Sequence, residues 1–461
     1  MIVTLFTLAS SVSFSSQSAR ADSATPARSD CQIESTLFEG WKAEKIRNEW
    51  VELIIVPQLG GRLMQVTFGG HPYLFVNREF AGKYFPPSEG AAKGKWFNYG
   101  GDKIWPMPEG SEDGQHWPGP ISDALDDGDY ALTIVSQGSR CAVRLDGPRD
   151  ERTGLQYARE ISVEPESPEI SFRATMKNVS THPIRWSAQS VTQYDTADAA
   201  NPETYNRDFW AFTPANARSS YLDGYHVHSG LAEDPSYSVK NGMFSLHWLY
   251  LQSEVWVDSP GGWLAVVDGA TNFAMVERFH FQEGAEYPGK ASVIFYKNGP
   301  AVELDDRGTP VIRTSPEDAR FYMEAELNSP MADLKPGESY TFSTEWFPAR
   351  MGANFKNVTD AGVIGEPLAA SASANADVLK LTGSFGVFFA GKLAARLYDD
   401  RGSEIAAVPL ESVIPVDLVK LNHAVKTAVA TARISVHLID RGGVDRGSLG
   451  EVRVNHERAG P

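Results

Sequence analysis

The sequence has little positive charge. Its 461 residues include 42 Lys and Arg against 59 Asp and Glu, so the formal net charge at pH 7 is −17. Such a chain is repelled by phosphate backbones and by anionic lipid headgroups, and we therefore expect no nucleic-acid partner. The charge says nothing against a neutral ligand such as a sugar.

Cysteine and several site motifs are also scarce or missing. Cys31 and Cys141 are the only cysteines, so one disulfide and two separate buried thiols both stay open. No G-x-G-x-x-G opens a predicted helix, and no G-x-S-x-G is present. These absences argue against a nucleotide-binding loop and a serine-hydrolase nucleophile elbow, and we predict no cofactor.

The N-terminus has the features of an export signal. Residues 2–14 are apolar and rich in small side chains, and Ala19-Arg20-Ala21 fits an A-x-A cleavage site. The apolar stretch is too short to span a bilayer. We therefore predict a signal peptide at residues 1–21, a periplasmic or secreted protein, and no membrane insertion of the mature chain.

Long amphipathic helices are missing as well, since no long segment shows a 3.6-residue apolar period. From residue 129 to about residue 347, runs of β composition follow one another, separated by Asn, Asp, Gly and Pro turns. Such spacing is typical of antiparallel sandwiches, and it predicts an all-β domain over residues 31–350.

Three further stretches of the chain have a different composition or a separate role. Residues 351–376 are rich in Ala, Gly, Ser and Asn, and we interpret them as a linker. Residues 378–461 alternate in hydrophobicity and predict a small immunoglobulin-like β-sandwich with a structural or docking role. Residues 78–128 have little periodicity and many Gly, Pro and Trp, and an irregular insertion of this length is usually functional.

Within that insertion an acid and a base stand side by side after Gly100-Gly101, in a segment that we expect to be a loop. Indole rings beside fixed polar groups are suited to hold a sugar ring. A loop whose tryptophans only fill a gap beneath it is the alternative. The residues predicted to bind the sugar here are Asn98, Asp102, Lys103, Trp105 and Trp117, with Arg62 from an earlier Gly-Gly turn.

Candidate catalytic groups come from two predicted strands and one loop. In residues 321–328, Glu324 and Glu326 share one strand face opposite apolar neighbours, so either is a candidate base; two solvated carboxylates on an edge strand are the alternative. In residues 273–282, His280 is a candidate acid and Arg278 a ligand contact on the same face.

Two further histidine features complete the candidates. His116 beside Trp117 is a second candidate acid. His226 and His228 form an H-x-H pair that could hold a metal with Asp223, but this spacing is common by chance, and we predict no metal.

Several motifs resemble a known superfamily. The "PQLGGRL" segment (57–63) and the "YMEAELNSPMADLKPGESYTFSTEWF" segment (322–347) resemble parts of the galactose mutarotase-like, or aldose 1-epimerase-like, superfamily. The segments "NYGGDKIWPMPE" (98–109) and "HWPGP" (116–120) resemble, more narrowly, the DUF4380 family. The resemblance covers about residues 35–350 and implies an antiparallel β-supersandwich with a carbohydrate-sized cleft on one face.

The resemblance also implies a reaction. In aldose epimerases a histidine on a central strand protonates the ring oxygen, and a late glutamate takes the anomeric proton. The family's histidine motif is absent here, and the strand that resembles its position, residues 186–194, carries Gln193. A glutamine holds a hydroxyl but does not exchange protons near neutral pH.

These observations leave three hypotheses. The first is an exported carbohydrate-binding protein, with epimerase-like acid/base chemistry at the anomeric centre as its enzymatic form. The second is a non-catalytic carbohydrate-binding or scaffold protein, which the missing histidine favours. The third is a lyase or glycoside hydrolase acting on an acidic polysaccharide, with Lys103 and Arg278 neutralising its carboxylate.

Overall fold

The computed structural model is built largely from β-strands and describes residues 30–89, 94–110, 113–121, 124–315, 320–372, 378–427 and 431–454. Its helical elements are short and include α2 (Ala124–Asp127), η1 (Arg78–Phe80) and η2 (Pro288–Lys290). No helix among these residues is long and apolar enough to cross a membrane. The predicted signal peptide, residues 1–21, lies outside the described residues.

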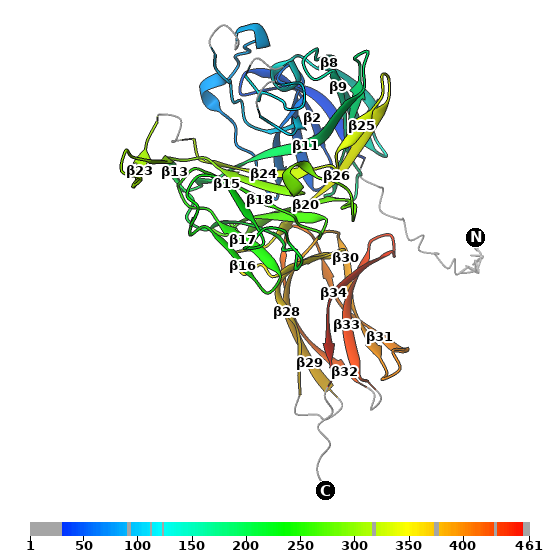
Figure 1. Cartoon of the computed structure of the whole chain (residues 1–461). Helices are drawn as coiled ribbons and strands as arrows, with labels where there is room; N and C mark the ends of the chain where they lie inside the picture. Colours follow the sequence, from blue (N-terminus) through cyan, green and yellow to red (C-terminus); the bar gives the residue numbers. More distant parts are fainter. Residues whose placement is uncertain are drawn as a thin grey trace, which may run out of the picture.

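Two large antiparallel sheets form the body of the protein (Figure 1). The first, sheet A, has twelve strands in the described part of the chain. Its order is β1 (Gln32–Phe38), β2 (Trp41–Arg47), β3 (Val51–Val56), β4 (Arg62–Phe68), β6 (Asp102–Met107), β11 (Ile184–Asp195), β24 (Tyr322–Asn328), β21 (Val293–Lys297), β18 (Ser253–Val257) and β15 (His226–Ser229), with β5 (His71–Pro72) beside β4 and β25 (Ala332–Leu334) beside β11.

The second, sheet B, has ten strands within the described ranges. Its order is β16 (Tyr237–Lys240), β17 (Met243–His247), β14 (Phe209–Pro214), β19 (Trp263–Asp268), β20 (Phe273–Phe279), β26 (Ser339–Arg350), β10 (Ile170–Asn178), β9 (Leu155–Val163), β8 (Cys141–Arg149) and β7 (Ala131–Ser136). Two small hairpins, β12 (Ala197–Asp198) with β13 (Asn201–Tyr205) and β22 (Ala301–Leu304) with β23 (Pro310–Arg313), lie outside both sheets.

A hydrophobic core fills the space between sheets A and B. On β24, Met323, Ala325 and Leu327 point into this core, so the alternate residues point to the outer face of sheet A. Of the two alternatives for the cysteines, the structure has the disulfide: Cys31, just before β1, is joined to Cys141 of β8, with Cα atoms 5.9 Å apart. The predicted all-β supersandwich is confirmed.

The C-terminal part is a smaller sandwich of two four-stranded sheets in the described residues (Figure 1). One sheet is β27 (Asn357–Thr359), β28 (Gly362–Ala372), β29 (Val378–Val387) and β32 (Leu418–Lys426); the other is β31 (Glu404–Val413), β30 (Gly391–Tyr398), β33 (Arg433–Asp440) and β34 (Asp445–Arg453).

The linker interpretation of residues 351–376 is therefore wrong, because β27 and β28 belong to this sandwich. Small residues are needed there for close strand packing: a Cβ on Gly362 would collide with the carbonyl oxygen of Gly386.

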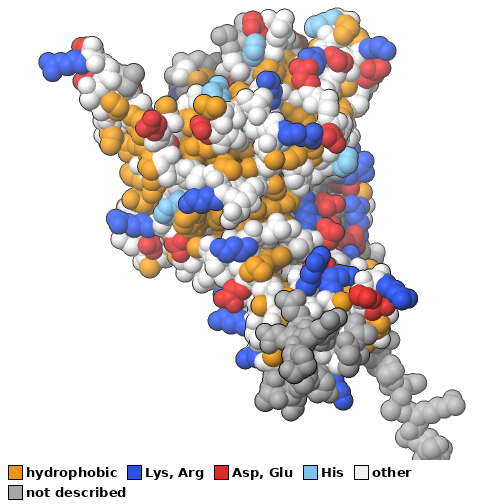
Figure 2. All heavy atoms as spheres, turned by 60° about the horizontal axis from the view of Figure 1, so that its bottom comes forward, with side chains coloured by type: hydrophobic (Ala, Val, Ile, Leu, Met, Phe, Trp, Pro, Cys, Tyr) orange, Lys and Arg blue, Asp and Glu red, His pale blue; other side chains and the backbone are white. Residues whose placement is uncertain are grey.

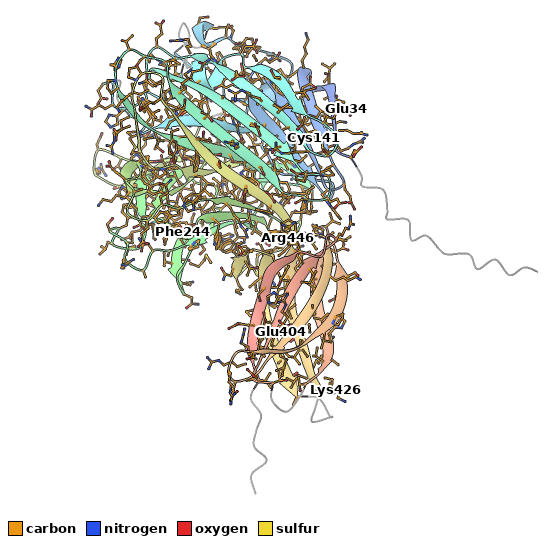
Figure 3. The ribbon with its side chains drawn as sticks, turned by 90° about the vertical axis from the view of Figure 1, so that its right-hand side faces the viewer. Glu34, Cys141, Phe244, Glu404, Lys426 and Arg446 are labelled. Carbon is orange, nitrogen blue, oxygen red and sulfur yellow. A yellow bond between two sulfur atoms is a disulfide. The ribbon has the colours of Figure 1, made fainter. Side chains whose placement is uncertain are left out.

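The two sandwiches meet at the outer face of sheet B. Val276 and Phe347 from sheet B pack in one buried cluster with Phe385 and Phe388 of the C-terminal sandwich. Arg446 lies at this junction in Figure 3, whereas Lys426 lies at the far end of the C-terminal sandwich. The buried contact with the C-terminal sandwich thus uses sheet B and leaves the outer face of sheet A for other contacts.

Candidate functional site

The Gly-Gly-Asp-Lys segment leads into strand β6, which lies between β4 and β11 of sheet A. The prediction that this segment is a loop is therefore wrong for residues 102–107. Gly100 and Gly101 turn the chain into the strand with φ values of 93° and 73°. A Cβ on Gly101 would lie 2.7 Å from the carbonyl oxygen of Leu63, so only glycine fits this approach. Pro106, which donates no backbone hydrogen bond, makes the strand hard to recognise from sequence.

Asp102 and Lys103 point to opposite faces of sheet A because neighbouring residues of a strand alternate. Asp102 is fully buried between the sheets, where it pairs with Arg159 of β9. The hydroxyls of Ser190 and Thr192 each lie 3.3 Å from its Oδ1. The predicted sugar contact of Asp102 is therefore wrong, since its carboxylate is a structural group of the core.

Lys103 instead meets Glu324 on the outer face. Its Nζ lies 3.1 Å from Glu324 Oε1, and Gln193 Nε2 donates to the same oxygen at 2.7 Å. Gln193 and Glu324 are direct partners in the β11–β24 register. The second oxygen of Glu324 takes part in neither bond. Because β24 lies between β11 and β21, the edge-strand alternative for the glutamates is wrong.

Glu326 is two residues further along β24 and has a different environment. Gln189 Nε2 donates to its Oε2 at 2.5 Å. Burial raises the pKa of Glu326 well above its ordinary value, and the neighbouring carboxylates of Glu324 and Glu254 raise it further. This environment favours the protonated carboxyl, which can donate a proton. One strand thus presents two glutamates with different hydrogen-bond partners.

Two more glutamates on this face escaped the sequence analysis. Desolvation, followed by the charges of Glu254 and Glu324, raises the pKa of Glu109 to about 7. The Glu109 side chain is nevertheless exposed, so water screens part of this effect. Burial also raises the pKa of Glu254, on β18. We call Glu109, Glu254, Glu324, Glu326 and Lys103 the carboxylate face.

A signal for one of them was present in the sequence. Glu109 ends the "NYGGDKIWPMPE" segment. A strand predicted over residues 102–107 would have shown that Glu109 closely follows the strand that carries Lys103. Glu254 carries no such signal, because only the β18–β21 register, which sets it opposite Tyr296, brings it to this face.

Asp126 of α2 holds the tryptophans beside this face. Its carboxylate accepts the indole N–H of Trp105 at 2.7 Å and that of Trp96 at 2.8 Å. Arg62, fully buried, donates to the same carboxylate at 2.8 Å. Lys103 Nζ lies 4.5 Å from the Trp105 ring centroid and 5.7 Å from that of Trp96.

This arrangement corrects two predicted sugar contacts. Arg62 orients Asp126 from inside the protein, and Trp117 is fully buried with its ring centroid 5.1 Å from that of Trp105. Trp105 itself is 6% exposed, whereas Trp96, which the sequence analysis did not select, is half-buried and has more ring surface open to a ligand.

Asn98 lies at the end of the carboxylate face. It is 3% exposed, and its side chain forms a hydrogen bond with the Tyr322 hydroxyl. Tyr322 precedes Glu324 by two residues on β24, so both side chains point to the same face. The structure therefore brings together Asn98, Lys103, Trp105, Gln193, Glu324 and Glu326 of the predicted site residues.

The structure does not bring His280 and Arg278 to this site. Strand β20 belongs to sheet B, and Arg278 lies on its outer face, where it donates to the carbonyl oxygen of Thr359. The Arg278 guanidinium is 4.8 Å from the Phe347 ring and 5.1 Å from the Phe388 ring, at the junction with the C-terminal sandwich. Their predicted roles beside Glu324 are therefore wrong.

Of the other histidines selected from the sequence, His226 and His228 are exposed and His116 is partly exposed. His116 Nδ1 pairs with Asp113 at 2.9 Å rather than with either glutamate of β24. On β15, the ring of His228 stacks on Trp256 at 4.2 Å, and His226 lies opposite Trp256 in the strand register. Among the described residues, no three His, Cys, Asp or Glu side chains are grouped to hold a metal ion.

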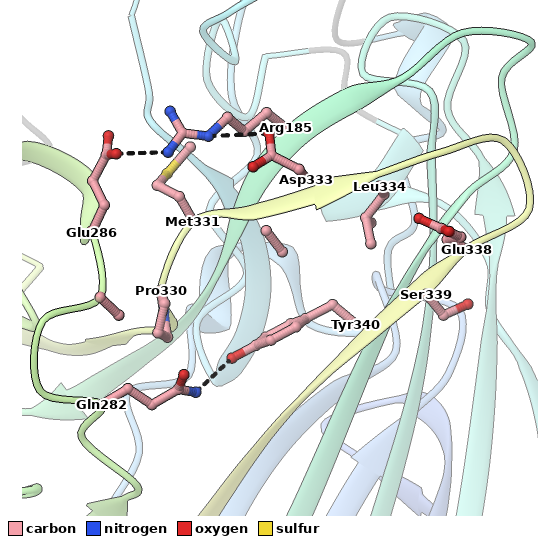
Figure 4. A pocket seen from close by; sticks show the side chains of 12 residues that line it. Arg185, Gln282, Glu286, Pro330, Met331, Asp333, Leu334, Glu338, Ser339 and Tyr340 are labelled. Carbon is pink, nitrogen blue, oxygen red and sulfur yellow. Dashed lines mark hydrogen bonds and ion pairs between the residues drawn. The ribbon is translucent and has the colours of Figure 1, made fainter.

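Figure 4 shows a cavity near the start of β25 in which Arg185 pairs with two of the acidic side chains, and its volume is about 600 Å³. Arg185 contacts Glu286 at 2.7 Å and Asp333 at 3.3 Å. Gln282 Nε2 donates to the Tyr340 hydroxyl at 3.4 Å. This cavity also has more carboxylates than cations, but Arg185 lowers the pKa of Glu286, whereas the pKa of Glu326 on the carboxylate face is raised.

The chain resembles solved structures at low identity. A TPR-domain-containing protein from Parabacteroides distasonis is 14% identical, with a TM-score of 0.46 over 71% of this chain and 55% of that one. A galactose mutarotase-like protein from Clostridium acetobutylicum is 11% identical, with a TM-score of 0.45 over 70% and 99% of the two chains. A putative mutarotase from Salmonella typhimurium is 10% identical, with a TM-score of 0.46 over 69% and 94%.

The chain thus spans about half the length of the first of these proteins. No family model and no curated protein matches the sequence, so the narrower DUF4380 resemblance stays a prediction. The fold and the site together define an all-β supersandwich protein with a face of closely spaced carboxylates.

Proposed function

We propose that the carboxylate face binds a carbohydrate and interconverts its anomers by acid/base catalysis. The observation that carries the proposal is the pair Glu324 and Glu326, adjacent on one face of a central strand but held by different partners. Lys103 lies next to Glu324, whereas burial favours the protonated form of Glu326. A carboxyl that burial keeps protonated, next to a second carboxyl held by a lysine, supplies the groups needed for one acid and one base.

In this mechanism the Glu326 carboxyl donates its proton to the ring oxygen of the sugar. The free oxygen of Glu324 accepts the proton of the anomeric hydroxyl, so the ring C–O bond breaks and an open-chain aldehyde forms. Rotation about C1–C2 followed by ring closure on the other carbonyl face yields the second anomer. Both protons then return, and no redox partner or cofactor is consumed.

The amides of the face supply hydroxyl contacts. Gln193 Oε1 is buried without a hydrogen-bond partner among the described residues. A buried acceptor without a partner is costly, and a sugar hydroxyl would satisfy it. Gln193 thus takes the hydroxyl-binding role expected from the sequence, and Glu326 takes the acid role that the missing histidine leaves open.

Export is part of the same proposal. The Cys31–Cys141 disulfide supports it, because such bonds persist in oxidising compartments, and residues 1–21 have the composition of a signal peptide. A non-catalytic sugar-binding protein is the second candidate, favoured by the absence of the family's histidine. The lyase or hydrolase hypothesis loses support, because Arg278 lies at the junction with the C-terminal sandwich.

The test is anomer exchange by NMR, with galactose, glucose and their uronic acids as probes. Wild type should accelerate exchange of at least one sugar, and Glu324→Gln and Glu326→Gln should each slow it by about 100-fold. Glu203→Gln, an exposed change on β13, is the matched control and should leave the rate unchanged. Binding with unaccelerated exchange would favour the non-catalytic candidate, and full activity in both variants would refute the acid/base assignment.

A further inference from the structure

A cavity of about 530 Å³ continues from the carboxylate face. Trp96, Asn98, Tyr296 and Tyr322 line the side of it that adjoins the face. Tyr296 is the direct register partner of Glu324, so the cavity begins next to the proposed base. Its volume is within the ~300–1,000 Å³ typical of small-molecule sites.

The charged side chains that line this cavity are mostly basic. Lys95, Arg313 and Arg320 line it, and Glu303 is the one acidic side chain among the described lining residues. This local excess of positive charge is unusual for a chain with a net charge of −17. On the face viewed in Figure 2, by contrast, Lys and Arg side chains lie among Asp and Glu.

The two arginines differ in how firmly they are held. Arg320 contacts Glu79 at 2.7 Å, and its side chain is 17% exposed. Arg313 contacts Glu303 at 3.2 Å, and both side chains are at least 60% exposed. An exposed pair of this kind contributes little and is screened by salt, so Arg313 can exchange Glu303 for an anionic ligand at small cost.

We propose that this cavity binds the anionic group of an acidic monosaccharide, a sugar carboxylate or a sugar phosphate, while the ring lies on the carboxylate face. The inference rests on the proposed function and specifies its substrate class. A guanidinium presents paired N–H donors that match a carboxylate or phosphate, and Asn98 and Asn298 place side-chain amides in the same lining.

The test compares sugars that differ only in the acidic group. Isothermal titration with galactose, galacturonate and galactose 6-phosphate, and with the three glucose counterparts, gives the preference for the acid and separates carboxylate from phosphate. Wild type should bind one acidic sugar at least about ten-fold tighter than its neutral parent, and added salt should weaken that preference.

Two variants with opposite expected effects on binding of the acidic sugar extend this test. Arg313→Gln should remove most of the preference without changing affinity for the neutral parent, whereas Glu303→Gln should tighten binding of the acid. Arg173→Gln, an exposed change on β10 of sheet B, is the matched control and should behave as wild type. Arg313 is exposed, so its variant should fold even if a variant of the half-buried Arg320 does not.

The outcomes separate this inference from the function on which it rests. Equal affinity for neutral and acidic sugars, or an unchanged preference in Arg313→Gln, overturns the anionic site while leaving the acid/base site standing. Failure of every sugar to bind overturns both. Loss of anomer exchange in Glu326→Gln with acid preference intact supports both.

Discussion

Two neighbouring residues of β6 form two different ion pairs, one on each side of sheet A. Asp102 pairs with Arg159 in the core, where the hydroxyls of Ser190 and Thr192 complete its surroundings. Lys103 pairs with Glu324 on the outer face, to which three more glutamates also belong. Both sides have more carboxylates than cations, since buried Glu277 lies beside Asp102 and its pKa is raised to about 8 by burial and by the Asp102 charge. The sides differ in access, because Glu277 is enclosed between the sheets, whereas the outer face adjoins a cavity.

The difference shows how one strand can serve both stability and chemistry. Between the sheets, Asp102 is paired with Arg159 and Glu277 accepts the Tyr194 hydroxyl, so both carboxylates serve the core. Where carboxylates exceed the available cations, some must hold protons near neutral pH, and the pKa values of Glu326, Glu254 and Glu109 are raised accordingly. Such perturbed groups are typical of functional sites.

The largest expected loss of stability comes from breaking the core pair of Asp102 and Arg159. Asp102→Ala leaves the buried Arg159 guanidinium without its carboxylate, and we expect a loss of about 3–5 kcal/mol in the free energy of unfolding. Urea denaturation followed by tryptophan fluorescence measures this. The exposed Asp129→Ala serves as control and should stay within about 0.5 kcal/mol of wild type. A cost for Asp102→Ala no larger than the control's would show that the pair is not structural.

A smaller loss is expected on the outer face. Lys103→Met leaves Glu324 without its cation, but the Glu324 carboxylate keeps its bond to Gln193, so we expect a loss of about 1–3 kcal/mol in the free energy of unfolding. The double variant Lys103→Met/Glu324→Gln removes both charges and should be more stable than Lys103→Met alone. Strictly additive losses in the same urea assay would contradict the pairing.

The smallest effect concerns pH. The pKa of Glu109 is raised from 4.5 to about 7, so its contribution to stability is fully present below pH 4.5 and is lost as pH rises through about 7. Because the side chain is exposed, the effect should stay below about 1 kcal/mol. Thermal unfolding of wild type and Glu109→Gln between about pH 4 and about pH 8 should give curves that differ in slope. If stability changed with pH equally in wild type and Glu109→Gln, the pKa of Glu109 would not be raised in the folded protein.

Local patterns in the sequence predicted part of this structure correctly. The alternation over residues 321–328 placed Glu324 and Glu326 on the outer face, because a two-residue period reports strand faces directly. The same reasoning failed at β6, where Gly100-Gly101 and Pro106 are typical of turns. Composition failed at β28, because small residues serve close strand packing as well as linkers.

The partners within the site could not be predicted, for a physical reason. Asp102 and Arg159 are 57 positions apart, and Lys103 and Glu324 are 221 apart. Contacts of this kind depend on which strands become neighbours, and no local pattern encodes that order. His280 was misplaced for the same reason, since its segment has the composition of either sheet.

The most direct test of the central claim is a crystal structure of wild type soaked with the acidic sugar that binds most tightly. The account predicts the sugar ring over Glu324 and Glu326, with the anomeric hydroxyl within hydrogen-bond distance of Glu324 and the anionic group near Arg313. A sugar bound in the cavity of Figure 4 or at the junction with the C-terminal sandwich, with the carboxylate face empty, would contradict it.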